Sequence, residues 1–230
     1  MHNLCVIIPF YNEVDFLLKS VNRVLKEEIF EQIILSDDCS DDGSELIAKK
    51  LSKQHEKIEY RKSLKNSGKG DALNSVKSFV KTTHVVIHDA DLEYFPEDIV
   101  EMYQISKNYP KSLILGSRFI GVKERKNVYF RTNLANRTMS LFFSLVNFQY
   151  ITDIATCYKL MPTSFFKDLN IKETGFSIEV ELLSKFLKTN SNVIEVPIKY
   201  EGRSYTDGKK IKASDGFKYL FNTVKYRFFN

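Results

Sequence analysis

Apolar runs of strand length alternate with amphipathic helical segments through the first 118 residues, and this alternation limits the possible folds more than any other feature. Strands are predicted at 4–10, 31–38, 57–63, 83–91 and 112–118. Helices are predicted between them at 14–27, 43–54, 70–82 and 96–108. Units of this length predict an α/β, Rossmann-like fold, in which a mostly parallel sheet carries helices on both faces.

Polar motifs follow the predicted strands. The strand ends carry "PFYNE", "SDDCSDD", "HDADLE" and "GSRF". In sheets of this kind, ligands bind beyond the carboxyl ends of the strands. We therefore expect the chemistry of this protein to collect at one edge of the sheet.

Residues 119–230 are less regular. Helices are predicted at 132–150, 178–189 and 215–229, strands at 155–162 and 192–200, and a basic loop at 201–211. The sequence contains no internal repeat and no break in composition. A single domain spanning 1–230 is therefore predicted.

The composition is ordinary for a soluble globular protein. The chain has 43% hydrophobic and 27% charged residues, and no apolar stretch approaches the roughly 18 residues of a membrane span. It enters a strand at once, without a leader, and its three cysteines favour a reducing cytoplasm. The net charge is +5, and residues 199–230 hold eight basic and three acidic side chains. This asymmetry suggests an anionic ligand or surface, and we expect no nucleic-acid partner.

Three carboxylates stand at alternate positions after the strand predicted at 83–91. They are Asp89, Asp91 and Glu93, and like charges this close repel one another unless a cation is present. Capping of the next helix does not explain them, because Glu97 and Asp98 already serve its first turn. Oxygen ligands at this spacing suit a hard divalent cation, so a Mg²⁺ or Mn²⁺ site is predicted.

Two further motifs point to a nucleotide. "NSGKGDAL" (66–73) lacks the glycine and hydroxyl spacing of a P-loop, but its glycine-rich turn and Lys69 could bind an anion, with a simple turn as the alternative. In "SDDCSDD" (36–42), Asp37 and Asp38 could accept hydrogen bonds from a nucleobase, over which Tyr11 could stack.

Seven motifs together resemble one family. "VIIPFYNE", "SDDCSDDGS", "NSGKGDAL", "DADLEYFPEDI", "GSRF", "TCYKLM" and "VPIKYEGRSYTDGKKI" occur in the order found in family 2 glycosyltransferases. Within that family the chain looks most like the polyprenyl-phosphate glycosyltransferases, the dolichyl-phosphate mannose synthase group. The resemblance covers residues 4 to 228.

The resemblance implies an A-type glycosyltransferase fold and a nucleotide-diphospho-sugar donor, GDP-mannose or UDP-hexose. It divides the domain into a nucleotide-sugar-binding half, 1–118, and an acceptor-binding half, 119–230. The donor-binding residues that it implies are Pro9, Tyr11, Glu13, Asp38, Lys69, Asp89, Ala90, Asp91, Arg118, Arg203 and Lys209. The implied metal ligands are Asp89, Asp91 and Glu93, and the implied catalytic residues are Asp91, Arg118, Arg131 and Arg203.

The acceptor decides the expected mechanism. An undecaprenyl or dolichyl phosphate is a dianion above its second pKa of about 6, so it can attack C1 of the sugar without a general base. One direct displacement of this kind inverts the anomeric centre. The alternative is a sugar hydroxyl acceptor, as in capsule, lipopolysaccharide or other surface glycan assembly. That acceptor needs a base, for which Glu179 or Glu181 could serve.

Other classes of protein fit less well. A sugar-nucleotide pyrophosphorylase needs a glycine-rich loop after the first strand, and "PFYNEVDF" has no glycine. A non-enzymatic carbohydrate-binding or scaffold module has no reason to keep the three carboxylates Asp89, Asp91 and Glu93, hereafter the acidic group, beside Arg118.

Two Phe-rich segments, 132–150 and 215–229, predict a membrane-binding surface. In 215–229, an apolar stripe lies between basic side chains, and 132–150 follows a basic cluster at 123–137. We expect peripheral association with the anionic cytoplasmic face of a membrane, the alternative being that both apolar faces pack on the sheet. The predicted stripe consists of Phe217, Leu220, Phe221, Val224 and Phe228.

Overall fold

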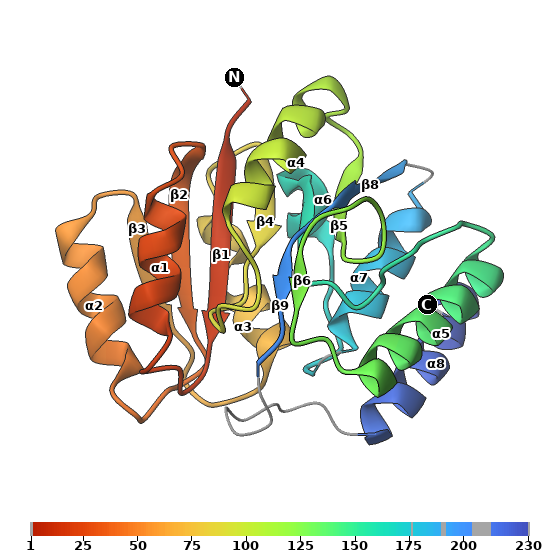
Figure 1. Ribbon diagram of the computed structural model, residues 1–230. Coiled ribbons are helices and arrows are strands. Elements are labelled where there is room, and N and C mark those ends of the chain that lie inside the picture. Colours follow the sequence, from red (N-terminus) through yellow and green to blue (C-terminus); the bar gives the residue numbers. More distant parts are fainter. Residues whose placement is uncertain (1, 176, 190–191, 204–212, 230) are drawn as a thin grey trace.

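A seven-stranded sheet forms the centre of the protein. The computed structural model describes residues 2–175, 177–189, 192–203 and 213–229 (Figure 1). The strand order is β3-β2-β1-β4-β7-β5-β8, and a second sheet pairs β6 with β9. The strands are β1 (Leu4–Phe10), β2 (Phe30–Asp37), β3 (Ile58–Lys62), β4 (His84–Ile87), β5 (Leu113–Ser117), β6 (Arg125–Lys126), β7 (Lys159–Pro162), β8 (Val193–Pro197) and β9 (Tyr200–Glu201).

Most of the sheet is parallel, as predicted. β1 pairs in parallel with β2 and β4, and β5 pairs in parallel with β8. The exception is β7, which lies antiparallel between β4 and β5. Five parallel strands of this sheet, β1 to β5, precede β7 in the chain, yet β4 and β5 are joined only through β7.

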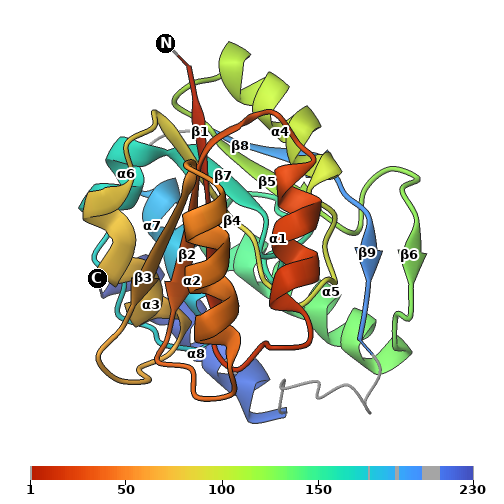
Figure 2. The same cartoon turned by 90° about the vertical axis from the view of Figure 1, so that its left-hand side faces the viewer.

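Helices cover both faces of the sheet (Figure 2). Side chains alternate across β1, so that Leu4, Val6 and Ile8 face the core under α1, α2 and α4. Cys5 and Ile7 face the opposite core, under α3, α6 and α7. The helices are α1 (Leu17–Leu25), α2 (Ser44–Gln54), α3 (Lys69–Val76), α4 (Glu97–Asn108), α5 (Phe130–Asn147), α6 (Thr163–Asp168), α7 (Ile178–Leu187) and α8 (Ala213–Phe228), with a 3₁₀ turn at Lys77–Phe79.

Two predicted strands differ from the structure. The single strand predicted at 192–200 consists of two strands, β8 and β9. Between them, the Lys199 backbone N–H donates a hydrogen bond to the Asp98 carboxylate at 2.7 Å, so the chain leaves the sheet at this residue. β9 then pairs with β6, which was not predicted. The strand predicted at 155–162 begins only at Lys159, and the short helix α6, also not predicted, follows it directly.

Helix α8 faces the protein with its polar side. It packs against α5 and α7, and its buried side chains are Tyr219, Asn222, Thr223 and Tyr226. Three residues of the predicted stripe point the other way: Phe217, Phe221 and Phe228 are 78%, 69% and 62% exposed, whereas Leu220 and Val224 are half-buried. The alternative in which this face packs on the sheet is therefore wrong.

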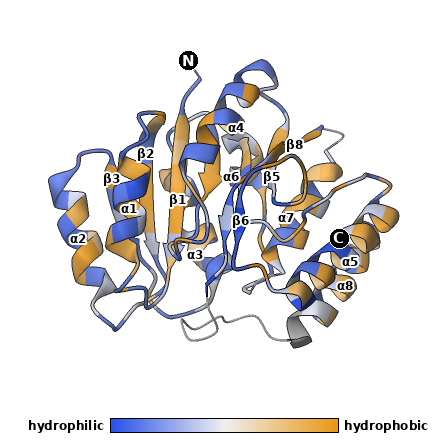
Figure 3. Ribbon diagram, in the orientation of Figure 1, coloured by the Kyte–Doolittle hydropathy of each residue, from blue (hydrophilic) through white to orange (hydrophobic). Residues whose placement is uncertain are grey.

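Helix α5 has the same orientation. Its buried residues are Ser140, Phe143, Ser144 and Asn147, whereas Leu141 and Leu145 are 57% and 66% exposed. Figure 3 shows the hydrophobic residues on these two helices at the edge of the molecule. Within the described residues, no helix combines the length and the apolar composition that a membrane span requires.

Candidate active site

A cavity of about 320 Å³ opens at the carboxyl ends of β1, β2 and β4. Thr174, Gly175 and Arg203 complete its wall from the second half of the chain. A larger hollow of about 650 Å³ lies between α6 and α7 and contains none of the predicted site residues. The predicted residues that line the first cavity, hereafter the donor cavity, are Pro9, Tyr11, Glu13, Asp38, Lys69, Asp89, Ala90, Asp91, Glu93 and Arg203.

Strained turns shape this edge of the sheet. Asn12, Cys39 and Leu92 follow β1, β2 and β4, and all three have positive φ values, of 54°, 66° and 65°. Non-glycine residues adopt this conformation at a cost of about 1 kcal/mol or more, and such strain is concentrated at functional sites. The Arg23 guanidinium donates to the Leu92 carbonyl at 3.2 Å and so holds the turn that carries the acidic group.

The two aspartates that end β2 have different surroundings. Asp38 faces the donor cavity, and its carboxylate accepts hydrogen bonds from the backbone N–H groups of Ser67 and Gly68 at 3.0 and 2.7 Å. Asp37 is fully buried and accepts from the Ser40 N–H and the Tyr60 hydroxyl. The prediction that Asp37 contacts a nucleobase is therefore wrong.

The glycine-rich turn serves packing more than anion binding. Gly68 has φ +92°, and a Cβ there would lie 2.4 Å from the Thr174 carbonyl oxygen. Since Asp38 takes the N–H groups of Ser67 and Gly68, these donors are not free for a phosphate. Of the groups predicted to bind an anion here, the Lys69 side chain lines the donor cavity.

The acidic group carries more negative charge than its neighbours compensate. Asp89 pairs with Lys69 at 2.8 Å, whereas Asp91 lies 4.0 Å from the Arg203 guanidinium. Burial, together with Glu93 and Asp89, raises the pKa of Asp91 to about 8. Glu93 lines the cavity as well, but its two oxygens accept hydrogen bonds from the Tyr200 hydroxyl and the Arg203 backbone N–H at 2.7 and 2.8 Å.

This donor set fits a divalent cation in part. Asp89 and Asp91 offer hard oxygen ligands and surplus negative charge, which Mg²⁺ and Mn²⁺ require. Across the described ranges, however, no three histidine, cysteine or acidic groups come together as a metal site. Glu93 is bound to Tyr200 and Arg203 instead, so its role as a metal ligand stays a prediction, and a bound ligand would have to supply the remaining oxygens.

Arg203 joins the two halves of the chain over the donor cavity. Its guanidinium donates to the Glu13 carboxylate at 3.1 Å and to the Asp91 carbonyl at 2.9 Å, and it lies 4.3 Å from the centre of the Phe16 ring. It thus places a fixed cation beside the acidic group. Lys209, the other predicted donor residue of this loop, lies outside the described residues.

Comparisons with known proteins agree with this geometry. Residues 5–169 match the family model described as Glycosyl transferase family 2. The chain belongs to that family. A dolichol-phosphate mannosyltransferase of Mycosarcoma maydis is 28% identical over 86% of this chain and 67% of its own. The UDP-N-acetylglucosamine–dolichyl-phosphate N-acetylglucosaminyltransferase of Methanococcus voltae is 29% identical over 95% of this chain and 94% of its own.

A solved structure confirms the fold. Glucosyl-3-phosphoglycerate synthase of Mycobacterium tuberculosis, in complex with Mn²⁺ and UDP, superposes with a TM-score of 0.73 at 13% identity, covering 98% of this chain and 80% of its own. The predicted A-type glycosyltransferase fold and the resemblance to polyprenyl-phosphate enzymes are both confirmed. The protein is a glycosyltransferase.

A second cavity of this family 2 glycosyltransferase adjoins the first. It measures about 100 Å³ and shares Lys69, Asp89, Asp91 and Glu93 with the donor cavity. Its other walls come in part from β9, α5 and α8, and Tyr94, Arg118, Ala155, Cys157 and Glu179 also line it. The lining residues from these elements are Thr132, Asn136, Met139, Tyr200, Gly216 and Tyr219. The acidic group therefore lies at the junction of the two cavities.

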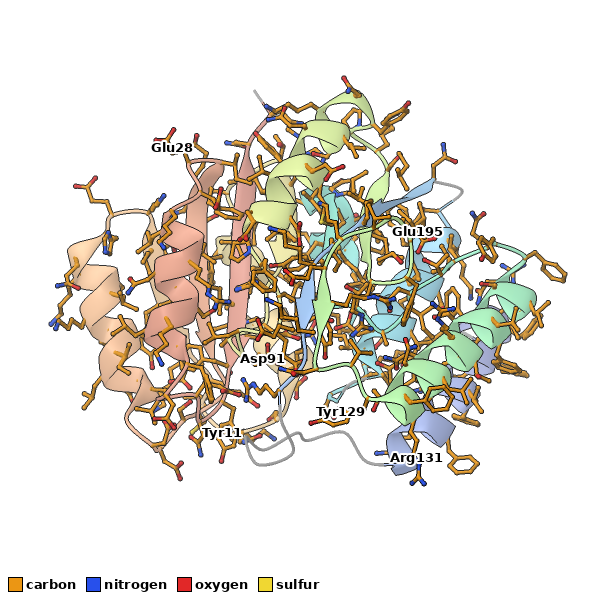
Figure 4. The ribbon with its side chains drawn as sticks, in the orientation of Figure 1. Tyr11, Glu28, Asp91, Tyr129, Arg131 and Glu195 are labelled. Atoms are coloured by element: carbon orange, nitrogen blue, oxygen red, sulfur yellow. The ribbon has the colours of Figure 1, made fainter. Side chains whose placement is uncertain are left out.

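The two remaining predicted arginines lie differently. Arg118 lines the second cavity but is buried, and its guanidinium binds the Asp153 carboxylate through two hydrogen bonds of 2.7 and 2.8 Å. Burial would lower the pKa of Arg118, but Asp153 raises it well above its ordinary value. Arg131 is exposed at the start of α5, apart from Asp91 and Tyr11 (Figure 4), and lines neither cavity. The catalytic roles predicted for these two arginines stay predictions.

Both carboxylates considered as a general base have partners. Glu179 binds Lys159 at 2.5 Å and Lys69 at 2.9 Å, and these lysines lower the pKa of Glu179 although burial alone would raise it. Glu181 accepts hydrogen bonds from the backbone N–H groups of residues 172 and 173 and pairs with Lys185 at 2.5 Å. Each carboxylate is thus engaged by at least one lysine, which disfavours either one as the base that takes a proton from an acceptor.

Proposed function

We propose that this glycosyltransferase transfers a sugar from a nucleotide-diphospho-sugar to a polyprenyl phosphate, such as undecaprenyl or dolichyl phosphate. The observation that carries the proposal is the pair of joined cavities with Lys69, Asp89 and Asp91 at their junction. One cavity is bounded by strand ends, and the other lies under α5 and α8, whose apolar sides face outward. Relatives that are named for dolichyl or dolichol phosphate acceptors support the same assignment.

The nucleoside would lie against Tyr11 and Asp38, and the diphosphate would lie between Lys69 and Arg203. A Mg²⁺ or Mn²⁺ ion held by Asp89 and Asp91 would neutralise the leaving diphosphate. The donor is a GDP-mannose or a UDP-hexose. Fixed cations at this position stabilise the charge that develops on the leaving group.

The acceptor phosphate would attack C1 from the second cavity, on the side opposite the diphosphate. Its dianion is present at neutral pH, since its second pKa is about 6. Positioning and charge neutralisation then suffice, and the single displacement inverts the anomeric centre. The engagement of Glu179 and Glu181 with lysines and backbone N–H groups disfavours the alternative, a sugar hydroxyl acceptor that requires a base.

We further propose that the protein works on the cytoplasmic face of a membrane. The exposed apolar residues of α5 and α8 would enter the lipid interface, and the exposed Arg131, Arg137 and Lys218 would contact anionic headgroups. Their charge attraction is screened by salt, so binding to vesicles of phosphatidylglycerol should weaken between low and high ionic strength.

A donor screen tests the proposal directly. Purified protein is mixed with Mn²⁺ or Mg²⁺, a short polyprenyl phosphate and radiolabelled GDP-mannose, UDP-glucose or UDP-N-acetylglucosamine. Movement of label into the organic phase is expected with one of these donors, and excess EDTA should stop it. A matched series with oligosaccharide acceptors and no lipid is the control. Transfer to the oligosaccharides alone would reject the lipid phosphate in favour of the hydroxyl acceptor.

A further inference from the structure

Four charged side chains of alternating sign connect the protein core to the junction of the two cavities. Lys159 binds Glu179 at 2.5 Å, Glu179 binds Lys69 at 2.9 Å, and Lys69 binds Asp89 at 2.8 Å. The four residues come from β7, α7, α3 and the turn after β4. Exposure rises along this charge chain, from 0% for the Lys159 side chain to 28% for that of Asp89.

The buried end of the charge chain is fully engaged. The Lys159 ammonium donates to the carbonyl oxygens of Ile154 and Thr156 as well as to Glu179. Lys159 thus fixes one oxygen of Glu179, and the other oxygen is left for Lys69. Stability alone gives little reason for such an arrangement, because apolar residues in place of a buried ion pair are often as stable or more stable.

The exposed end reaches the site. Lys69 lines both the donor cavity and the second cavity, so its ammonium group is the cation common to the two. A lysine side chain has several rotatable bonds and loses up to about 2 kcal/mol of conformational entropy when it is fixed. Asp89 alone would not hold the Lys69 ammonium in place, since a bound ligand can compete for the Asp89 carboxylate. Glu179 remains as a second anchor when that happens.

We propose that Lys159 and Glu179 are positioning residues, which hold the Lys69 ammonium at the junction of the two cavities whether or not Asp89 is engaged by a ligand. Lys69 then contacts the diphosphate of the donor directly. Lys159 lines neither cavity, and Glu179, which lines the second cavity but not the donor cavity, acts on the diphosphate through Lys69. This inference rests on the proposed function, because it assigns the diphosphate to the donor cavity.

A double-mutant cycle tests the inference. The paired variant Lys159→Met with Glu179→Gln removes both charges together, so that neither is left buried alone. Lys69→Met removes the cation that they hold, and the triple variant combines all three changes. Binding of UDP and of GDP in the presence of Mn²⁺ is measured by calorimetry, which requires no acceptor and no turnover. Melting temperature is recorded for every variant.

The inference expects non-additivity. Lys69→Met should weaken binding of the nucleotide that the wild type accepts by about tenfold, and the paired variant should weaken it by about fivefold. The triple variant should bind no more weakly than Lys69→Met, since no ammonium remains to be positioned. A merely structural pair would lower the melting temperature without changing nucleotide affinity.

Two further variants serve as a control and as a replacement for the paired variant. Lys185→Met breaks the Glu181–Lys185 pair on the same helix, which is not part of the charge chain, and should leave affinity unchanged. If the paired variant does not fold, Glu179→Asp keeps the charge but shortens the reach by one methylene, and it should weaken binding at least threefold.

Either of two results overturns the inference. The first is wild-type nucleotide affinity in the paired variant, or in Glu179→Asp if that variant replaces it. The second is a loss of affinity in the triple variant that equals the sum of the losses in the paired variant and in Lys69→Met. If the wild type itself binds neither UDP nor GDP, the proposed function fails first.

Discussion

Helices α1 and α8 are both amphipathic, yet they present opposite sides to the protein. On α1, the apolar residues Leu17, Val21 and Val24 are completely buried against the sheet. On α8, polar and tyrosine side chains face inward, and Phe217 and Phe221 face outward. A periodic apolar stripe therefore predicts a helix and a buried face, but it does not say what buries that face. For α1 the partner is the sheet, and for α8 we propose that it is a membrane.

A similar difference is expected between side chains that stabilise the fold, such as those of α1, and side chains that serve function, such as Asp91. Asp91 follows β4 and lines both cavities, so Asp91→Ala should lower transfer by at least about 1,000-fold, through loss of its proposed interaction with the metal and the diphosphate. The melting temperature should not fall. Transfer rates and thermal melts of the two proteins check this. Turnover of the variant within tenfold of the wild type would show that the acidic group is not catalytic.

Matched substitutions on the two helices test the comparison most directly. Val21→Asp places an unpaired carboxylate in the core and should lower the free energy of unfolding by about 3 kcal/mol or more. Phe221→Asp changes an exposed position and should alter it by less than about 0.5 kcal/mol. Only the second substitution should reduce sedimentation with anionic vesicles at low salt. Denaturant titrations and vesicle sedimentation of both variants distinguish the two faces, and equal destabilisation would contradict the outward orientation of α8.

A smaller effect is expected from pH. The pKa of Asp91 is raised from its ordinary 3.8 to about 8, so between those values the folded protein keeps a proton that the unfolded chain has lost. Stability contributed by Asp91 therefore falls as the pH rises through this window. Asp91→Asn has no such loss, and in metal-free buffer it should exceed the wild type by about 2 kcal/mol at pH 8.5, a value reduced by the 26% exposure of the side chain. The two proteins should converge near pH 4, and a difference that does not vary with pH would contradict the shifted pKa.

The smallest effect on activity is expected from removing Arg203, which connects residues 119–230 to residues 1–118. Arg203→Ala removes a cation that binds Glu13 and Asp91, so use of the donor should fall about tenfold, or 1.4 kcal/mol. Arg203→Lys keeps the charge but not the paired hydrogen bonds and serves as the control, with an intermediate loss expected. Initial rates at varied donor concentration measure both. Unchanged kcat and KM in the alanine variant would reduce this contact to a structural one.

The strands were the most predictable part of the molecule. β1 lies where the apolar run of residues 4–10 indicates, since an uninterrupted run of this length is buried on both faces. The donor cavity was also foreseeable, because parallel strands bring their carboxyl ends to one edge. The outward orientation of α5 and α8 was left open, as the same stripe fits a sheet or a membrane.

The contacts that complete the site were beyond sequence reasoning. Asp153, the partner of Arg118, lies 35 residues further along the chain in a loop with no motif of its own. Lys159 gave one visible signal, a lysine inside an apolar strand, but nothing in the sequence points from it to Glu179. The left-handed turn at Leu92 likewise has no marker, since leucine rarely adopts positive φ.

The antiparallel strand β7 has a consequence for synthesis of the protein on the ribosome. When residues 1–118 have emerged, β4 exposes an unpaired edge and β5 has no neighbour to join, because both pair with β7. The missing strand is complete only at Pro162, which at ordinary translation rates follows roughly two to nine seconds later. During that interval β4 has one open edge and β5, which also pairs with β8, has two, and open edges invite pairing with other chains. We therefore expect the nascent chain to depend most on chaperones in the interval before β7 has been made.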